Sequence, residues 1–213
     1  MINMNTSSDY VLSELLRVKA IKIQPSNPFT WATGWFSPIY FDSRKLLSYP
    51  RSRNLIKLEL ARLIAEQYPQ AEVIAAVATN AIAMGMLVAE ALGLPFVYVH
   101  PEPKDHGFEN RIEGDLRPRQ NVVVIEDQVS VGKNCLKVVD AIRKSGCKVL
   151  GMFTIFNYNL PNTATNMNEN EVSVVALADF DSVIKKALQN KIITPEEEKV
   201  LHSWQKNPAE WQK

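Results

Sequence analysis

The stretch from Asn121 to Asn134, NVVVIEDQVSVGKN, constrains the fold of this chain more than any other. An apolar, largely β-branched run begins at Val122 and ends at two adjacent acids, Glu126 and Asp127, and a helical pattern opens at Val131. An uninterrupted apolar run is typical of a strand covered on both faces, as in a parallel sheet. This stretch therefore predicts a central parallel strand that leads through a short polar turn into a helix.

The turn after this strand is a candidate binding site. In open parallel sheets, ligands bind beyond the carboxyl ends of the strands. Ser130, Gly132 and Asn134 provide small or hydrogen-bonding positions where a helix N-terminus could hold a phosphate. A Walker A loop is rejected, because it would need glycine at Asp127 and Ser or Thr at Asn134. The plain alternative is an ordinary strand-loop-helix whose acids suit the helix dipole.

The rest of the chain alternates short apolar runs with helical periodicity. Strands are predicted at 73–78, 96–99, 149–156 and 172–177, and helices at 8–20, 48–67, 81–92, 131–145, 180–190 and 195–205. Residues 29–41 contain glycine and proline and predict a hairpin or two short strands in a small cap. The expected fold class is α/β, with an open, mainly parallel five-stranded sheet, helices on both faces and a small N-terminal cap. We expect one domain over 1–213, divided into a cap (about 1–45), a core (about 46–178) and C-terminal helices (about 179–213).

Composition excludes several classes of partner. The net charge of +1 gives no reason to expect nucleic acid or a membrane surface as a partner. No apolar run approaches the roughly 18 residues of a membrane span, and the N-terminus lacks the apolar region of a signal peptide. The two cysteines, Cys135 and Cys147, both fall in predicted packed structure. They form neither a disulfide framework nor a metal cluster, which favours a reducing cytoplasm.

Residues 100–119 have no apolar periodicity and are rich in proline and charge. A structureless stretch of this length inside a compact domain is more often a functional lid than a linker. Without ligand, residues 101–115 are expected to be mobile, because they offer little apolar surface to bury.

Several motifs, in order, resemble a known family. The strand, the acid pair and the glycine turn are similar to the phosphoribosyl pyrophosphate (PRPP) motif of type I phosphoribosyltransferases. Further segments resemble the orotate phosphoribosyltransferases: FTWATGWFSPIY at 29–40, YFDSRK at 40–45, ATNAIA at 78–83, PKDHG at 103–107 and EGDL at 113–116. Together these segments cover most of residues 10–160.

The resemblance implies transfer of 5-phosphoribose from PRPP to N1 of orotate, giving orotidine 5′-monophosphate and pyrophosphate, with Mg²⁺ required. The transition state resembles an oxocarbenium ion while negative charge grows on the departing pyrophosphate. A lid lysine stabilises that charge best once water is excluded. By family position the lysine is Lys104, assisted by His106.

The resemblance also implies the remaining binding residues. Glu126 and Asp127 would hold the ribose hydroxyls, and Asp127 would serve catalysis and reach Mg²⁺ through PRPP. The 5′-phosphate would lie against Ser130, Val131, Gly132, Lys133 and Asn134, and the pyrophosphate against Thr79 and Asn80. Tyr40, Phe41, Ser130 and Tyr158 would contact orotate. A homodimer is implied, with each lid reaching the neighbouring site.

The chain departs from the family pattern around the substrate. His100 and Pro101 precede the lid lysine where the family has a basic cluster, Asn80 replaces a glycine, and Lys133 and Asn134 alter the phosphate turn. Phe36 stands where a lysine is common, and the segment 156–158 lacks an Asp-Arg pair. Two alternatives therefore stay open: a type I transferase for another base, and a catalytically silent homologue that binds a nucleotide or PRPP and regulates a partner.

Overall fold

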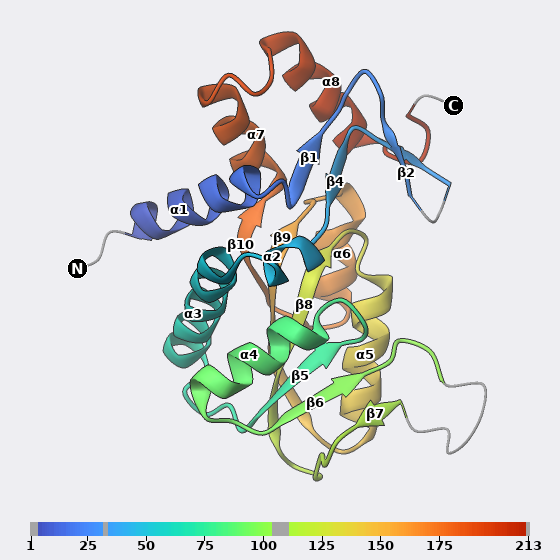
Figure 1. Ribbon diagram of the computed structural model, residues 1–213. Helices are drawn as coiled ribbons and strands as arrows, with labels where there is room; N and C mark the ends of the chain where they lie inside the picture. The colour runs from blue at the N-terminus through green and yellow to red at the C-terminus, as the bar shows by residue number, and fades with distance from the viewer. Residues whose placement is uncertain (1–3, 32–33, 104–110, 212–213) are drawn as a thin grey trace.

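The computed structural model describes residues 4–31, 34–103 and 111–211, and its centre is a mainly parallel sheet (Figure 1). In these residues the sheet has six strands in the order β10-β9-β8-β5-β6-β7. Their bounds are β5 Val73–Val77, β6 Phe96–Val99, β7 Ile112–Glu113, β8 Asn121–Val129, β9 Lys148–Asn157 and β10 Val174–Asp179. The five predicted strands are confirmed and run parallel. The strand count was wrong by one, because β7 adds an antiparallel edge of two residues, too short to leave a pattern in the sequence.

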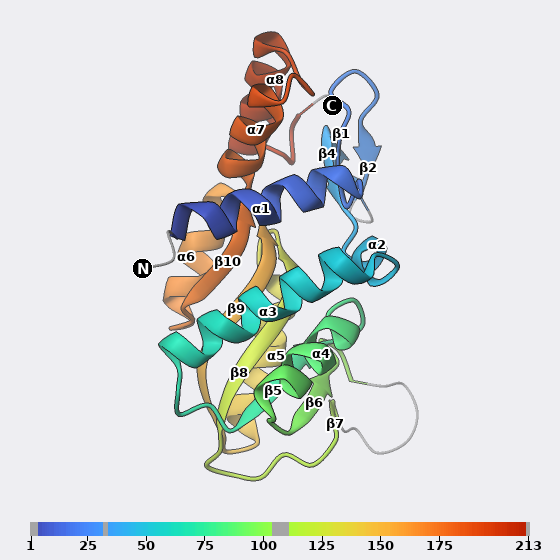
Figure 2. The ribbon, with the colours of Figure 1, turned by 60° about the vertical axis from the view of Figure 1, so that its left-hand side comes forward.

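Helices cover both faces of the sheet, as predicted. One face carries α1 (Met4–Arg17), α3 (Pro50–Gln67) and α4 (Ile82–Leu92), and the other carries α5 (Lys133–Lys144) and α6 (Pro161–Glu169) (Figures 1 and 2). Val123 and Ile125 of β8 belong to the first core, whereas Val122 and Val124 belong to the second. Burial on both faces explains why the segment from Val122 to Ile125 is apolar at every position.

The cap consists of four short strands and a single-turn helix. The strands are β1 (Ile21–Ile23), β2 (Phe29–Thr30), β3 (Phe36–Ser37) and β4 (Ile39–Phe41), followed by α2 (Arg44–Leu47). β2 pairs antiparallel with β3, which confirms the hairpin, and β1 pairs with β4.

The C-terminal helices α7 (Phe180–Gln189) and α8 (Pro195–Lys206) lie beside the cap, at the top of Figures 1 and 2. The fully buried Trp204 of α8 donates its Nε1–H to the carbonyl oxygen of Phe36 at 3.0 Å. Its ring meets those of Trp31 and Tyr158 edge-on, with centroids 5.7 and 6.0 Å apart. Helix α8 therefore holds the cap against the end of the sheet.

Local signals located most helix ends correctly. Gly93 and Gly146 adopt positive φ at 65° and 83°, where glycine pays no Cβ penalty. Thr194 forms a capping box with Glu197, and Pro195 opens α8. Helix α6 was not predicted, because its residues PNTATNMNE are polar and rich in asparagine. No helix in the described part of the chain is long and apolar enough to cross a membrane.

Candidate active site

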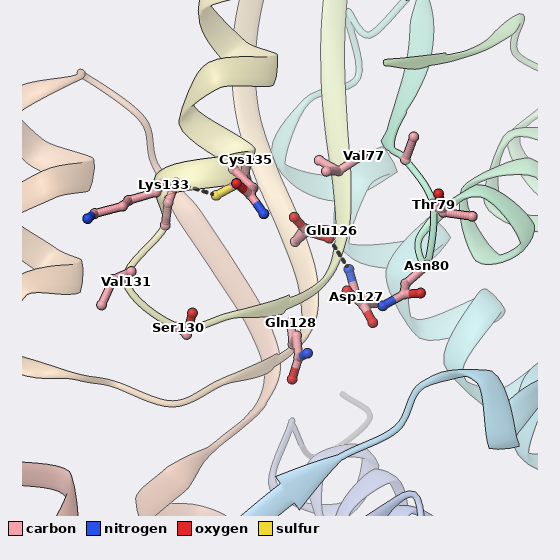
Figure 3. Close-up of a pocket in the computed structure, with 13 residues that line it drawn as sticks. Val77, Thr79, Asn80, Glu126, Asp127, Gln128, Ser130, Val131, Lys133 and Cys135 are labelled. Atoms are coloured by element: carbon pink, nitrogen blue, oxygen red, sulfur yellow. Dashed lines mark hydrogen bonds between the residues drawn. The ribbon is translucent and has the colours of Figure 1, made fainter. Parts of the chain in front are cut away.

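A cavity of about 330 Å³ opens at the carboxyl ends of β5 and β8 (Figure 3). Three segments meet there: the end of β5 with the turn into α4, the end of β8, and the turn into α5. The lining residues are Val77, Ala78, Thr79, Asn80, Glu126, Asp127, Gln128, Ser130, Val131, Gly132, Lys133, Asn134 and Cys135. The structure thus brings together all predicted PRPP-binding residues that it describes.

The two acids lie inside β8 rather than beyond its end, because the strand continues to Val129 by pairing with Asn157 of β9. Consecutive strand residues point to opposite faces, so the two carboxyl groups leave the strand in different directions (Figure 3). Asp127 is 5% exposed and its Oδ2 accepts a hydrogen bond of 2.6 Å from the Ser43 hydroxyl. The cap therefore contacts the acid pair directly through the residue that precedes α2.

Glu126 occupies an apolar, dehydrated position. Its Oε1 accepts the backbone N–H of Asp127 at 2.9 Å. Burial, reinforced by the neighbouring Asp127 charge, raises the pKa of Glu126 well above its ordinary value. Glu126 also lines the cavity, where its carboxyl group can form hydrogen bonds with a ligand. Such a group suits a neutral polyol hydroxyl.

The turn from β8 into α5, residues 130–134, forms a phosphate loop. Gly132 has φ +83° and precedes the first turn of α5. Within the described chain, the backbone N–H groups of residues 131–134 have no acceptor. The first N–H groups of a helix have no partner within it, and together with the helix dipole they attract anions. This geometry fits a phosphate monoester.

Three further residues that were predicted to bind substrate, Thr79, Asn80 and Lys133, also line this cavity. Thr79 and Asn80 are exposed at the turn before α4, and the side chain of Asn80 extends toward Asp127 (Figure 3). Lys133 is exposed, and its ammonium group lies away from Glu126 and Asp127 (Figure 3).

A second cavity of about 410 Å³ adjoins the first. It is lined by Thr30, Trp31, Tyr40, Gln128, Ser130, Asn134 and Tyr158. Gln128, Ser130 and Asn134 line both cavities, so the two are contiguous. A polar space bordered by aromatic side chains suits a flat heterocycle.

Of the four residues predicted to contact a base, three line this cavity and one does not. Phe41 is buried in the core, where its ring packs on Phe156 with centroids 5.5 Å apart. Its role is corrected: the Phe41 backbone N–H donates to the Tyr158 hydroxyl at 3.2 Å and so orients Tyr158. Burial raises the pKa of Tyr158, which keeps the phenol neutral.

Sequence reasoning missed Thr30, Trp31, Ser43 and Gln128. The Oε1 of Gln128 is buried and has no hydrogen-bond partner in the described residues. Buried polar atoms normally have partners, so an unsatisfied one beside a cavity is a place for a ligand donor. A polar residue directly after the two acids was the available signal in the sequence.

Lys104 and His106 lie outside the described residues, as does the rest of the segment 104–110 in the middle of the predicted lid. The flanking segments are held in place by Arg111, which donates to the carbonyl oxygens of His100 and Pro101 at 3.0 and 2.6 Å. Glu102 forms an ion pair with Lys137 of α5. The negative charge of Glu102 is therefore balanced locally.

Comparison with solved structures places the fold. The orotate phosphoribosyltransferase of Aeropyrum pernix superposes with a TM-score of 0.74 at 24% identity, covering 83% of this chain and 97% of that one. The UMP synthase of Leishmania donovani superposes with a TM-score of 0.79 at 21% identity over 93% of this chain, which spans 42% of the length of that protein. These likenesses show that the chain has the type I phosphoribosyltransferase fold.

Comparison of sequences identifies the family. No model of a protein family matches the chain. The orotate phosphoribosyltransferase of Porphyromonas gingivalis is 53% identical over 208 residues, which cover 98% of this chain and 99% of that protein. The chain belongs to the orotate phosphoribosyltransferase family.

Proposed function

We propose that this protein transfers 5-phosphoribose from PRPP to orotate, giving orotidine 5′-monophosphate and pyrophosphate in pyrimidine nucleotide biosynthesis. The observation that carries the proposal is the pair of contiguous cavities, which share Gln128, Ser130 and Asn134. A ribose over the acid pair would present its anomeric carbon to the cavity bordered by Tyr40 and Tyr158. The identity of 53% to a named orotate phosphoribosyltransferase favours orotate over another base, and an active enzyme over a silent homologue.

In this proposal each part of PRPP has its own contacts. The free N–H groups of the phosphate loop bind the 5′-phosphate. Glu126 and Asp127 hold the ribose hydroxyls and so orient the sugar while the bond at its anomeric carbon stretches. The pyrophosphate lies toward Thr79 and Asn80.

Mg²⁺ belongs to the proposal as a companion of PRPP. The described residues contain no cluster of three or more His, Cys, Asp or Glu side chains that could hold a metal. Mg²⁺ usually binds through one or two carboxylates together with substrate phosphates, so Asp127 and the diphosphate form a fitting donor set. When bound, it neutralises charge on the leaving pyrophosphate.

The lid completes the site in this proposal. Lys104 supplies positive charge to the departing pyrophosphate, and His106 assists it. Because Glu102 pairs with Lys137, its negative charge is balanced beside the lid.

We further propose a cytoplasmic homodimer in which each lid reaches the neighbouring site. One observation supports the dimer: Leu58 on α3 and Met86 on α4 are exposed apolar side chains. Light scattering at micromolar concentration tests the assembly. Mixed dimers of Lys104→Ala and Asp127→Ala subunits should regain activity if lids act across the interface, and no recovery would restrict each lid to its own subunit.

The decisive test of the function combines two assays on the wild-type chain. Calorimetry should show PRPP binding that strengthens with Mg²⁺, and pyrophosphate release should require orotate rather than uracil or adenine. Lys104→Ala should lower kcat by about two orders of magnitude or more, as expected for loss of a transition-state charge contact. Lys199→Ala, at an exposed position of α8, is the matched control. Absence of PRPP binding at millimolar concentration would end the transferase proposal.

A further inference from the structure

Helix α6 packs on the outer side of the phosphate loop. The Thr163 hydroxyl donates a hydrogen bond to the carbonyl oxygen of Ser130. One turn along the helix, Asn166 Nδ2 donates to the carbonyl oxygen of Val131 at 2.8 Å. Neither α6 residue lines the cavity on the inner side of the loop.

Met167 of the same helix sets how closely α6 approaches the loop. Met167 is buried, and a Cβ added to Gly132 would lie 2.3 Å from its Cε. Glycine at this position thus permits both the positive φ and the contact with α6. Three consecutive loop residues are therefore held by three residues of one helix.

These contacts divide the polar groups of the loop between two sides. The carbonyl oxygens of the two neighbouring residues, Val129 and Gly132, also accept hydrogen bonds within the protein. The Val129 oxygen accepts from the Tyr158 N–H at 2.9 Å, and the Gly132 oxygen accepts from the Leu136 N–H at 3.0 Å. The N–H groups of residues 131–134, by contrast, have no acceptor in the described chain. The loop presents donors to the cavity and keeps its acceptors on the protein side.

The planar trans peptide explains how a bond to a carbonyl can act on the phosphate site. Within one peptide unit, the C=O of a residue and the N–H of the next residue point in opposite directions. A hydrogen bond that holds the Ser130 carbonyl outward therefore turns the Val131 N–H inward. The Asn166 bond to the Val131 carbonyl does the same for the Gly132 N–H.

We propose that Thr163 and Asn166 are positioning residues of the phosphoribosyl site, which orient the N–H groups of Val131 and Gly132 toward the 5′-phosphate. This inference rests on the proposed function. Both residues act through the loop and neither touches the substrate. The helix after β9 is accordingly part of the binding site for a phosphate monoester, although it lies behind the loop.

The test removes each side-chain donor while keeping the side-chain size. Thr163→Val and Asn166→Leu are compared with Thr165→Val and Asn168→Leu, which make the same changes at exposed positions of α6. Thr163→Val and Asn166→Leu should each weaken binding of PRPP and of ribose 5-phosphate by about 5- to 30-fold, the effect of losing one or two oriented hydrogen bonds. The KM for PRPP should rise by a similar factor, while pyrophosphate binding and the KM for orotate stay within about twofold.

Further variants separate positioning from loss of fold. Thr163→Ser retains the hydroxyl and should bind like the wild type, whereas a purely apolar packing role predicts the reverse order, with Thr163→Val binding normally and Thr163→Ser weakened. Asn166 is only half-buried, so its variant tests the inference even if Thr163→Val unfolds.

The outcomes also distinguish the two proposals. If the wild type binds neither PRPP nor ribose 5-phosphate, the proposed function fails. If the wild type binds both ligands, and Thr163→Val and Asn166→Leu fold and bind them equally well, the positioning inference is overturned. An equal loss in the Thr165 and Asn168 controls would overturn it as well.

Discussion

Ser43→Ala tests whether the cap controls the acid pair. The Ser43 hydroxyl, 6% exposed, donates at 2.6 Å to an Asp127 carboxylate that is 5% exposed. Hydrogen bonds to charged groups contribute about 1.5–3 kcal/mol, and here the loss also leaves a buried acceptor without its donor. For a chain of this size, that loss lowers the melting temperature by about 3–12 °C.

The assay is denaturant unfolding followed by tryptophan fluorescence, combined with PRPP calorimetry. A double-mutant cycle with Asp127→Ala isolates the pair, and its coupling energy should reach about 1.5 kcal/mol or more. Ser203→Ala, at an exposed position of α8, is the matched control and should change stability by less than about 0.5 kcal/mol. A coupling energy near zero would refute the reasoning, because the hydroxyl would then contribute nothing through Asp127.

Three further predictions concern stability and pH. Glu126→Gln should stabilise the fold at neutral pH. Because folding raises the pKa of Glu126, the contribution of this group to the free energy of unfolding falls as pH rises above about 4.5, so the stability difference between the variant and the wild type should grow over that range and then level off. A stability difference independent of pH would contradict this prediction. The pKa of Glu14 shifts in the opposite direction, because hydrogen bonds from Arg17 and then Ser52 lower it to about 2. The stability that Glu14 adds should therefore disappear between about pH 5 and 2 in the wild type, and acid titration of Glu14→Gln should lack this dependence. Gly151→Ala should cost about 1–3 kcal/mol in denaturant unfolding, because its Cβ would lie 2.6 Å from the Tyr68 hydroxyl, and an unchanged midpoint would show that Tyr68 moves freely.

Local patterns were sufficient for most of the architecture. The apolar run of β8, the glycines at Gly93 and Gly146 and the capping box at Thr194 each act within a few residues, so they can be recognised without knowing the fold. The motif around Glu126 and Asp127 was equally local, and it identified the edge of the sheet where the cavity lies. Hydrophobic periodicity and capping chemistry therefore determined the five parallel strands, most of the helices and the location of the site, but neither β7 nor α6.

Contacts between distant segments were decided only by the tertiary structure. Ser43 meets Asp127 across 84 positions of sequence, and the Phe41 N–H meets the Tyr158 hydroxyl across 117. Helix α6 left no periodic signal, yet its Asn166 orders the phosphate loop from behind. Phe41 reads as a binding aromatic next to Tyr40 in the sequence, but β4 turns alternate side chains to opposite sides and buries Phe41 in the core. Hydrogen bonds and burial depend on which surfaces meet after packing, and that is a property of the folded chain rather than of any one stretch of it.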